Sequence, residues 1–524
     1  PVDTDLHYYV PRKELVDRAY TQLKGVIPDK GGHYITVWAP RQTGKTWIMQ
    51  QVTEKIRNQG NFDIGIITMQ SAKKIKSDKR ILELFVRNLK EWFGKDLPNI
   101  KTWDNLHSLF TKKYFQNPVI LIIDEFDALR EDFINNFANE FRDMHIKRQN
   151  QANRPSGEKT CLLHGLALIG VRSVLGIENE TGSPFNVQRG LHIPNLTDNE
   201  VMVMFRWYEK ESGQKVEQDV VRRLICETRG QPGLTCWLGE LLTEGFPGYQ
   251  PEKDRPVNIN DFEYVFRMAV QALPNTNILN IISKARQTKY RDIVLKLFKT
   301  DRKIIFGYDK TRLNFLYMNG VTDIENTPEN LYVRFSSPFV QKRLFNYFSG
   351  ELFEDTGKLH EPFDDLSDTF TEKGLHIKNL MQRFETYLKK NREWLLEDAP
   401  RRKDMGVFEA VYHFSLYRYL LDFLGMRHAR VWPEFPTGNG KIDIIIKYAG
   451  TVYALELKSY TSESGYNDAL VQAAGYGKQL ELAEVSLIFF VEYIDETNRE
   501  KYEKDYQDAE TGVRVVPVFV ETGN

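Results

Sequence analysis

A short apolar segment that runs directly into a glycine-lysine-threonine turn constrains this chain more than any other feature. Residues 34–38 read as a β-strand, and an apolar helical pattern starts after the turn. The turn has the sequence Ala39-Pro40-Arg41-Gln42-Thr43-Gly44-Lys45-Thr46. It fits the pattern G-x-x-x-x-G-K-S/T except that an alanine replaces the first glycine, which the backbone tolerates where φ stays negative. Such a turn points backbone N–H groups at phosphate oxygens, so it predicts a nucleoside phosphate site.

A second apolar strand ends in two carboxylates. Residues 119–123 are all Val, Ile or Leu, and Asp124 and Glu125 follow them. Open α/β sheets bind ligands at the carboxyl ends of their strands, so we expect these carboxylates near the phosphate turn. Lys45 should then contact the β- and γ-phosphates. Thr46 and Asp124 should hold Mg²⁺, while Glu125 polarises the attacking water. The two motifs together predict binding of ATP or ADP and hydrolysis of ATP.

The pattern around these motifs is that of an α/β protein. Polar residues at 149–159 predict a mobile loop, and helical spacing from 198 to about 273 predicts a helical lid. Short β-branched runs alternate with longer helical patterns, which indicates a P-loop NTPase parallel sheet with crossover helices. These runs are residues 34–38, 64–68, 119–123 and 166–171.

Residues 8–245 resemble the AAA-like ATPases of the STAND and archaeal type. Four further segments carry this resemblance, namely Tyr9-Val10-Pro11-Arg12, Val171-Arg172, Ser183-Pro184-Phe185-Asn186-Val187 and Gly230-Gln231-Pro232. The resemblance implies that Arg12 lies beside the adenine, that Arg172 is a sensor arginine and that Pro232 contacts the nucleotide from the lid. No arginine finger acting on a neighbouring subunit is identified, so assembly into a ring stays open.

A second candidate site lies on a predicted hairpin near residue 450. Asp443 and Glu456 flank the turn Ala449-Gly450 at equal distances, so a two-residue turn places them opposite each other with Cβ atoms about 5 Å apart. Lys458 lies on the same face because strand side chains alternate. Two such carboxylates repel each other unless a cation lies between them. We expect Mg²⁺ or Mn²⁺, held by Asp443 and Glu456, in a site suited to phosphodiester hydrolysis.

Residues 380–495 resemble the PD-(D/E)XK nuclease superfamily, which has a restriction-endonuclease-like α/β fold. The resemblance rests on the spacing of Asp443 to Glu456-Leu457-Lys458, although Ile442 stands where the family pattern has proline. It implies that Glu409, on the preceding helix, joins a second metal ion. Gln472 and Tyr476 match the family's Gln-x-x-x-Tyr motif.

The chain is therefore expected to contain five parts. An acidic, linker-like composition separates an ATPase half from a nuclease-like half, and two helical patterns followed by a strand-like segment predict a winged helix between them. The expected boundaries are 1–195 for the ATPase core, 196–285 for the helical lid, 286–350 for the winged helix, 351–374 for the acidic linker and 375–524 for the nuclease-like domain.

The charge balance excludes a protein that binds nucleic acid through its overall charge. Lys and Arg total 71 against 72 Asp and Glu, a net charge of −1. Contacts with phosphates must come from local patches, of which residues 73–80 and 401–403 are candidates. The three cysteines lack a CxxC spacing, and no secretion signal or apolar run of about 18 residues is visible. We therefore expect a cytoplasmic protein with reduced thiols and no membrane partner.

These features predict an ATP-hydrolysing protein that controls a metal-dependent nuclease. Its partner would be nucleic acid, DNA rather than RNA, with a homo-oligomer or a trigger protein as a further partner. The resemblances also fit a role in defence against foreign DNA. Two alternatives stay open. One is a nucleotide-locked switch of the STAND kind, whose C-terminal domain recruits a partner without cleavage. The other is an ATPase that translocates on DNA.

Overall fold

The computed structural model divides the chain into two compact units. Unit 1 comprises Pro1–Phe266 and Tyr317–Gly320, and unit 2 comprises Arg267–Leu316 and Val321–Asn524. The side chains of Glu409, Glu434 and Asp443 lie outside the description, although their backbone is part of it. The residues that the structure describes are 8–170, 189–298, 303–360, 364–371, 374–397, 399–400, 407, 409–425, 427–434, 443–460 and 462–523.

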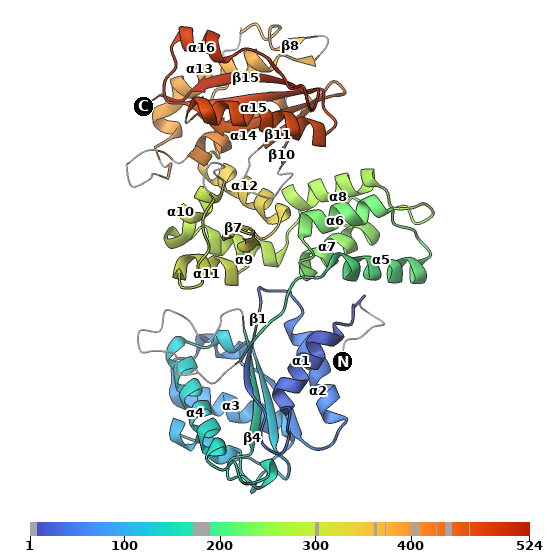
Figure 1. Cartoon of the computed structure of the whole chain (residues 1–524), viewed down its shortest axis with the longest axis vertical. Coiled ribbons are helices and arrows are strands. Elements are labelled where there is room, and N and C mark those ends of the chain that lie inside the picture. Colours follow the sequence, from blue (N-terminus) through green and yellow to red (C-terminus); the bar gives the residue numbers. More distant parts are fainter. Residues whose placement is uncertain are drawn as a thin grey trace. The chain divides into compact units, whose positions relative to one another are not determined.

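A five-stranded parallel sheet forms the centre of unit 1 (Figure 1). The four predicted strands are present. The fifth, β5, was not predicted because only Leu191 of its four residues is buried, and its Arg-Gly start lacks a strand signal. The strand order is β2-β3-β4-β1-β5, and the strands are β1 (Tyr34–Trp38), β2 (Asp63–Thr68), β3 (Val119–Asp124), β4 (Leu163–Gly170) and β5 (Arg189–His192).

Alternate residues of these strands fill two separate cores, because helices cover both faces of the sheet. Ile120 and Ile122 belong to the core that contains α1 (Lys13–Lys24) and α2 (Lys45–Arg57). Leu121 and Ile123 belong to the core that contains α3 (Asp78–Phe93) and α4 (Glu131–Gln149). Burial on both faces explains why these strands read as continuous apolar runs. Unit 1 also contains short 3₁₀ helices at Gln70–Lys74, Trp103–Leu109, Phe126–Ala128 and Ser156–Glu158.

The polar segment 149–159 differs from the mobile loop that its composition predicts, because its side chains anchor it to the core. Ser156 and Lys159 are buried, and Lys159 Nζ donates to the carbonyl of Lys30 at 2.9 Å. Arg148 donates to the carbonyl of Cys161 at 2.6 Å. The Nδ1 atom of His164 lies 2.6 Å from Ser156 Oγ, and its Nε2 lies 2.8 Å from the carbonyl of Lys24.

The helical pattern predicted from residue 198 is present as a run of helices, and its role as a lid stays a prediction. Thr197 and Glu200 form a reciprocal capping box at the start of α5, which satisfies backbone N–H groups of the first helical turn. The helices of this part are α5 (Asp198–Ser212), α6 (Gln218–Thr228), α7 (Pro232–Thr243) and α8 (Ile259–Gln271).

The first part of unit 2 is helical and ends in a hairpin and a further helix. The hairpin pairs Thr322 with Phe335, and its second strand, residues 331–335, is the strand-like segment that follows the two helical patterns in the sequence. This order is the one expected of a winged helix, an assignment that stays a prediction. The elements are α9 (Thr276–Ala285), α10 (Thr288–Leu297), α11 (Thr311–Met318), β6 (Thr322–Asn326), β7 (Leu331–Phe335) and α12 (Pro338–Leu352).

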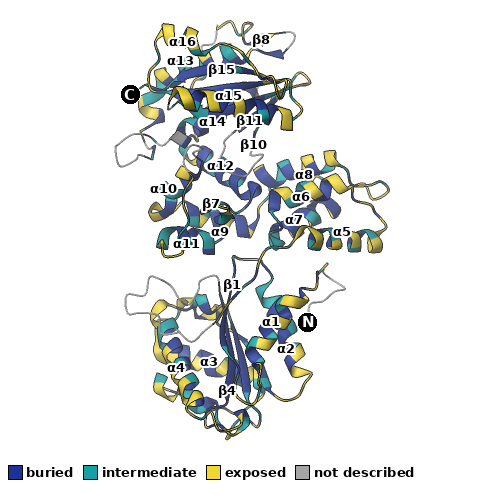
Figure 2. Cartoon of the chain, viewed as in Figure 1, coloured by how far each residue is buried: buried dark blue, intermediate teal, exposed yellow. Residues whose placement is uncertain are grey.

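The C-terminal part of unit 2 is built on a six-stranded mixed sheet, buried along its centre (Figure 2). The sheet has the order β10-β11-β12-β13-β15-β14. Helix α15 packs on the face that carries Phe489, and α14 stacks His413 on Phe490 of the opposite face. The elements are α13 (Ile377–Leu395), α14 (Glu409–Gly425), β10 (Arg430–Glu434), β11 (Asp443–Tyr448), β12 (Thr451–Ser459), α15 (Glu463–Gln479), β13 (Glu484–Val491), α16 (Glu496–Tyr502), β14 (Tyr506–Gln507) and β15 (Arg514–Glu521).

The acidic segment before this sheet makes more contacts than a solvated linker would. Thr356 Oγ1 donates to Asp422 of α14 at 2.7 Å, and Tyr387 of α13 donates to the Thr356 carbonyl at 2.7 Å. Arg383 pairs with Asp368 at 2.6 Å, so part of the negative charge is neutralised within the fold. A short pair of strands, β8 (Phe370–Thr371) and β9 (Gly374–Leu375), closes the segment. The boundaries of the five predicted parts stay a prediction.

Within the described residues, no helix combines the length and the apolar character that crossing a membrane requires.

Candidate functional site

The phosphate turn joins β1 to α2 in the predicted way. Gly44 is the N-cap residue of α2 and has φ 84°, and Gln42 has φ 56°. The left-handed conformation favours glycine, which explains why residue 44 is one. Ala39 is buried and is not among the residues with positive φ, so alanine fits where the pattern has glycine. The N-terminus of α2, with its free N–H groups, therefore forms one end of a cavity suited to an anion.

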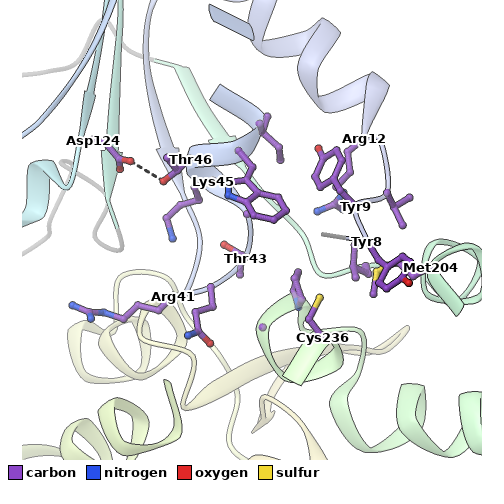
Figure 3. Close-up of a pocket in the computed structure, with 18 of the residues that line it drawn as sticks. Tyr8, Tyr9, Arg12, Arg41, Thr43, Lys45, Thr46, Asp124, Met204 and Cys236 are labelled. Carbon is purple, nitrogen blue, oxygen red and sulfur yellow. Dashed lines mark hydrogen bonds between the residues drawn. The ribbon is translucent and has the colours of Figure 1, made fainter. Parts of the chain in front are cut away.

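Lys45 and Thr46 reach the groups that a phosphate and a metal ion would use. Lys45 Nζ donates to the carbonyls of Ala39 at 2.9 Å and Pro40 at 2.7 Å. Burial lowers the pKa of Lys45 to about 8, opposed by the charges of nearby carboxylates. Thr46 Oγ1 donates to Asp124 Oδ2 at 2.7 Å (Figure 3). A hydroxyl and a carboxylate at this distance are hard oxygen donors of the kind that Mg²⁺ prefers.

Three carboxylates line this end of the cavity, one more than the sequence analysis assigned. Asp124 Oδ1 accepts the backbone N–H of Glu125 at 2.8 Å, and Glu125 has φ 52°. Burial, followed by the charges of Asp127 and Asp124, raises the pKa of Glu125. Asp127 lines the same cavity and is among the carboxylates that favour the charged form of Lys45. Its place three residues after Asp124, in a single turn after β3, is the signal that could have identified it.

The opposite end of the cavity is aromatic and apolar, and the sequence analysis missed most of it. Tyr9 lies 5.5 Å from Trp47, ring centre to ring centre, and its hydroxyl accepts from Gln51 at 2.5 Å. Tyr8 and Met204 lie at this end of the cavity, away from Thr46 and Asp124 (Figure 3). The whole cavity has a volume of about 500 Å³. Its size, one apolar end and one charged end suit a nucleotide.

The lid contacts the phosphate turn directly. Gln231 Nε2 donates to the carbonyl of Arg41 at 3.0 Å, and the backbone N–H of Gly233 donates to the carbonyl of Gln42 at 3.0 Å. A Cβ at residue 233 would lie 2.5 Å from the Gln42 side chain, so only glycine allows this approach. Pro232, the first residue of α7, lines the cavity as expected of a nucleotide contact.

Arg12 lines the cavity but uses its guanidinium to fasten the base of the lid. It donates to the carbonyls of Pro194 at 2.7 Å and Asn195 at 3.1 Å, and it pairs with Glu200 at 3.2 Å. This geometry indicates that Arg12 positions the start of α5. The other predicted arginine, Arg172, lies outside the described residues.

The predicted register of the C-terminal hairpin is present. Asp443 pairs with Glu456, and Tyr448 pairs with Thr451. The turn residues Ala449 and Gly450 have φ 50° and 82°, as a type I′ turn requires. This turn sets the register and so brings the two acidic positions into one row of the sheet.

Lys458 and Gln472 complete a chain of contacts with Glu456. The Glu456 side chain is fully buried, and Lys458 Nζ lies 3.3 Å from its Oε1. Lys458 Nζ also donates to Gln472 Oε1 of α15 at 2.9 Å. Tyr476 lies one turn further along α15 and is buried. The structure thus brings together Glu456, Lys458 and Gln472, and it places Glu409 at the first residue of α14.

A third acidic position, Glu434, was not predicted. It pairs in register with Asp443, so Glu434, Asp443 and Glu456 form one row across β10, β11 and β12, which we call the acidic row. Among the described side chains, no group of three or more His, Cys, Asp or Glu has the arrangement of a metal site. Asp443, Glu434 and Glu409 are outside that set of side chains.

The basic clusters predicted as phosphate contacts are only partly described. Lys73, Lys74, Lys79 and Arg80 are exposed, whereas residues 401–403 lie outside the described residues. Lys79 pairs with Glu83 at 3.9 Å along one face of α3.

Comparison with known proteins supports the N-terminal assignment. The sequence of residues 1–238 matches the family model of the AAA-like domain. A search of curated proteins found no match. Among solved structures, the chain is similar to a Walker-type ATPase of Pyrococcus abyssi, with 12% identity, a TM-score of 0.40, and coverage of 64% of this chain and 96% of that chain.

Two further solved structures are similar. The Orc1 protein of Aeropyrum pernix, in complex with DNA, has 14% identity, a TM-score of 0.32, and coverage of 67% of this chain and 97% of that chain. Cdc6p of Pyrobaculum aerophilum has 12% identity, a TM-score of 0.35, and coverage of 66% and 96%. The match over residues 1–238 and the cavity geometry together indicate that the N-terminal part of the chain is a P-loop ATPase domain of the AAA-like kind.

Proposed function

We propose that this chain uses ATP binding and hydrolysis in its AAA-like domain to control a metal-dependent nuclease in its C-terminal domain. The observation that carries the nuclease proposal is the row in which Asp443 pairs with Glu456, together with Lys458 at 3.3 Å from Glu456. The substrate proposed is nucleic acid, DNA rather than RNA, inside the cytoplasm. Defence against foreign DNA is the role that fits such an enzyme.

In the ATPase site, each part of a bound ATP has residues suited to it. Thr46 and Asp124 would hold Mg²⁺, which would neutralise charge on the β- and γ-phosphates. Lys45 exchanges its contacts with Ala39 and Pro40 for phosphate oxygens. Glu125 accepts a proton from the attacking water, a task that its raised pKa favours. Tyr9 and Trp47 flank the apolar end, where the base would lie.

In the nuclease site, the donor set fits a hard divalent cation. Glu456 is a fully buried carboxylate beside the Lys458 ammonium, and carboxylate oxygens are the ligands that such a cation takes. Mg²⁺ or Mn²⁺, held by Asp443 and Glu456, would supply Lewis-acid stabilisation of the phosphate. Lys458 holds its ammonium toward Glu456, and Gln472 restricts the position of that ammonium. Glu409 and Tyr476 are proposed to complete the site from α14 and α15.

The contacts between lid and phosphate turn favour one of the alternatives as a second candidate. Gln231 and Gly233 hold the backbone of Arg41 and Gln42, so a bound nucleotide and the lid share one segment. This arrangement suits a switch that keeps ADP and recruits a partner without cleavage. A translocating ATPase differs from both, because its hydrolysis rate would rise with DNA length.

The test incubates the purified full chain with plasmid, single-stranded DNA and RNA. Each substrate is given Mg²⁺ or EDTA, with and without ATP. We expect cleavage only with Mg²⁺ and a rate that changes with ATP. ADP that co-purifies with the chain, combined with intact substrates in every condition, would favour the switch and contradict the nuclease.

The matched variants are Lys45→Ala and Lys55→Ala, both on α2. Lys45 lies in the phosphate turn, whereas Lys55 is an exposed residue paired with Asp17. We expect Lys45→Ala to lose the response to ATP, and Lys55→Ala to behave as wild type. An ATP response that survives in Lys45→Ala would show that ATP acts elsewhere.

A further inference from the structure

Two cations lie opposite each other on the sheet that carries the acidic row. Arg430 of β10 pairs in register with Lys447 of β11, and both are exposed. Paired residues have Cβ atoms about 5 Å apart, so two positive charges there destabilise the sheet. Within the described residues, neither cation has an ion-pair partner. We call Arg430 and Lys447 the basic row.

The basic row lies on the same face of the sheet as the acidic row. Strand residues two apart share a face, so positions 447, 445 and 443 of β11 line up along it. The intervening row consists of Trp432, Ile445 and Ala454, which pack in the core beneath α15. Four residues at about 3.3 Å each separate Lys447 from Asp443, a distance of about 13 Å.

Protection of a sheet edge does not account for this pair. Charged residues on edge strands prevent pairing with other chains, and β10 is an edge strand. That role could explain Arg430, but β11 lies between β10 and β12 and has no open edge. Arg514 of β15 is also an exposed cation, but unlike the basic row it has ion-pair partners. It pairs with Asp505 at 2.5 Å and lies 3.5 Å from Glu484.

We propose that the basic row binds the phosphate backbone of the nucleic acid that the nuclease site cuts. This inference rests on the proposed function and adds a substrate contact to it. An ammonium beside a guanidinium makes charge-assisted hydrogen bonds to phosphate oxygens and relieves the repulsion between the two cations. About 13 Å corresponds to about four phosphates of one B-DNA strand along the helix axis. A ligand that reaches both rows is therefore a polymer and not a single nucleotide.

The test measures DNA binding by the full chain in EDTA, so that no cleavage takes place. A labelled duplex of about 20 base pairs is titrated across a series of salt concentrations. Each phosphate contact contributes about 0.9 to the slope of log affinity against log salt, so Arg430→Ala with Lys447→Ala should lower the slope by about 1.8. Affinity at physiological salt should fall about tenfold or more. The control Arg514→Ala should keep the wild-type slope and affinity.

Conservative exchange and cleavage assays separate the possible outcomes. Arg430→Lys with Lys447→Arg should restore the wild-type slope because both charges remain. A double alanine variant with the wild-type slope, or a wild-type chain that does not bind DNA, would overturn the basic row as a binding site. Cleavage with Mg²⁺ but an unchanged slope would contradict only this inference. A lowered slope without any cleavage would support the basic row and contradict the nuclease.

Discussion

Thr46 Oγ1 lies 2.7 Å from Asp124 Oδ2, which joins the first turn of α2 to the end of β3. These two residues are 78 positions apart, and parallel pairing of the sheet brings them together. Thr46 and Asp124 would hold Mg²⁺, which would neutralise negative charge on the phosphates. The hydrogen bond therefore keeps the two proposed Mg²⁺ ligands next to each other.

Asp124→Asn should lower ATP hydrolysis by about 100-fold or more, because an amide oxygen holds Mg²⁺ less firmly than a carboxylate. Hydrolysis is measured by phosphate release at saturating ATP. Asp96→Asn is the control, since Asp96 is exposed and pairs only with Lys90 at 3.4 Å among the described ion pairs. Similar losses in both variants would show that the effect is general and not local to the site.

Affinity for ATP should fall above about pH 8. Burial lowers the pKa of Lys45 to about 8, so the free site is increasingly neutral at higher pH. Bound phosphates require the ammonium, and binding must then take up a proton. We expect a loss of up to about tenfold per pH unit between about pH 8 and about pH 9.5. Calorimetry in two buffers of different ionisation heat measures the proton uptake. Proton uptake that persists in Lys45→Met would contradict this assignment.

Unit 1 should lose stability in mild acid through His164. Burial lowers the pKa of His164 to about 4, below its ordinary value of about 6.5. The folded state thus favours the neutral ring, and its contribution is complete above about pH 6.5 and lost as the pH falls toward about 4. The full effect is about 3 kcal/mol. Thermal unfolding at several pH values measures it. A His164→Gln variant with the same pH dependence as wild type would show that other groups titrate.

Nucleotide should protect Cys236 from thiol reagents. Cys236 is exposed and lines the cavity, Cys226 is exposed on α6, and Cys161 is buried. Burial raises the pKa of the Cys236 thiol to about 11, so its labelling without nucleotide is already slow. Maleimide labelling of Cys236, followed by peptide mass spectrometry, should slow by about a further tenfold with saturating ADP. Cys226 serves as an internal control because it does not line the cavity. Equal protection of both cysteines, or of neither, would contradict the position of the nucleotide.

Glu456→Gln should lower the rate of Mg²⁺-dependent cleavage by about 100-fold or more, while the affinity for ATP stays unchanged. The exchange keeps the shape of the buried side chain and removes the charge that a cation needs. Lys458→Ala should act similarly, but weakening a buried ion pair costs about 3–5 kcal/mol, so its thermal unfolding must be followed too. Lys501→Ala is the control, since Lys501 pairs with Glu463 on the surface. Full cleavage by Glu456→Gln would remove the site assignment.

Local signals made much of both sites predictable. The phosphate turn needs Gly44 at positive φ, and the hairpin register follows from the two-residue turn at Ala449-Gly450. The sequence carries no such local signal where two segments far apart in the chain meet without a short turn that sets their pairing. Glu434 enters the acidic row from β10, whose connection to β11 is long and carries no register signal. Met204 and Trp47 share a cavity although they lie on separate helices, so spacing alone does not connect them.

The tight turn at Ala449-Gly450 also makes the proposed cutting chemistry sensitive to chain length. One extra residue in this turn would shift the register of β11 against β12 by one position. Every side chain of the shifted strand would then point to the opposite face of the sheet. Asp443 would then leave its place opposite Glu456 although neither acid had been altered. Insertions or deletions in this turn would therefore abolish cleavage in related chains that still carry every residue of the proposed nuclease site.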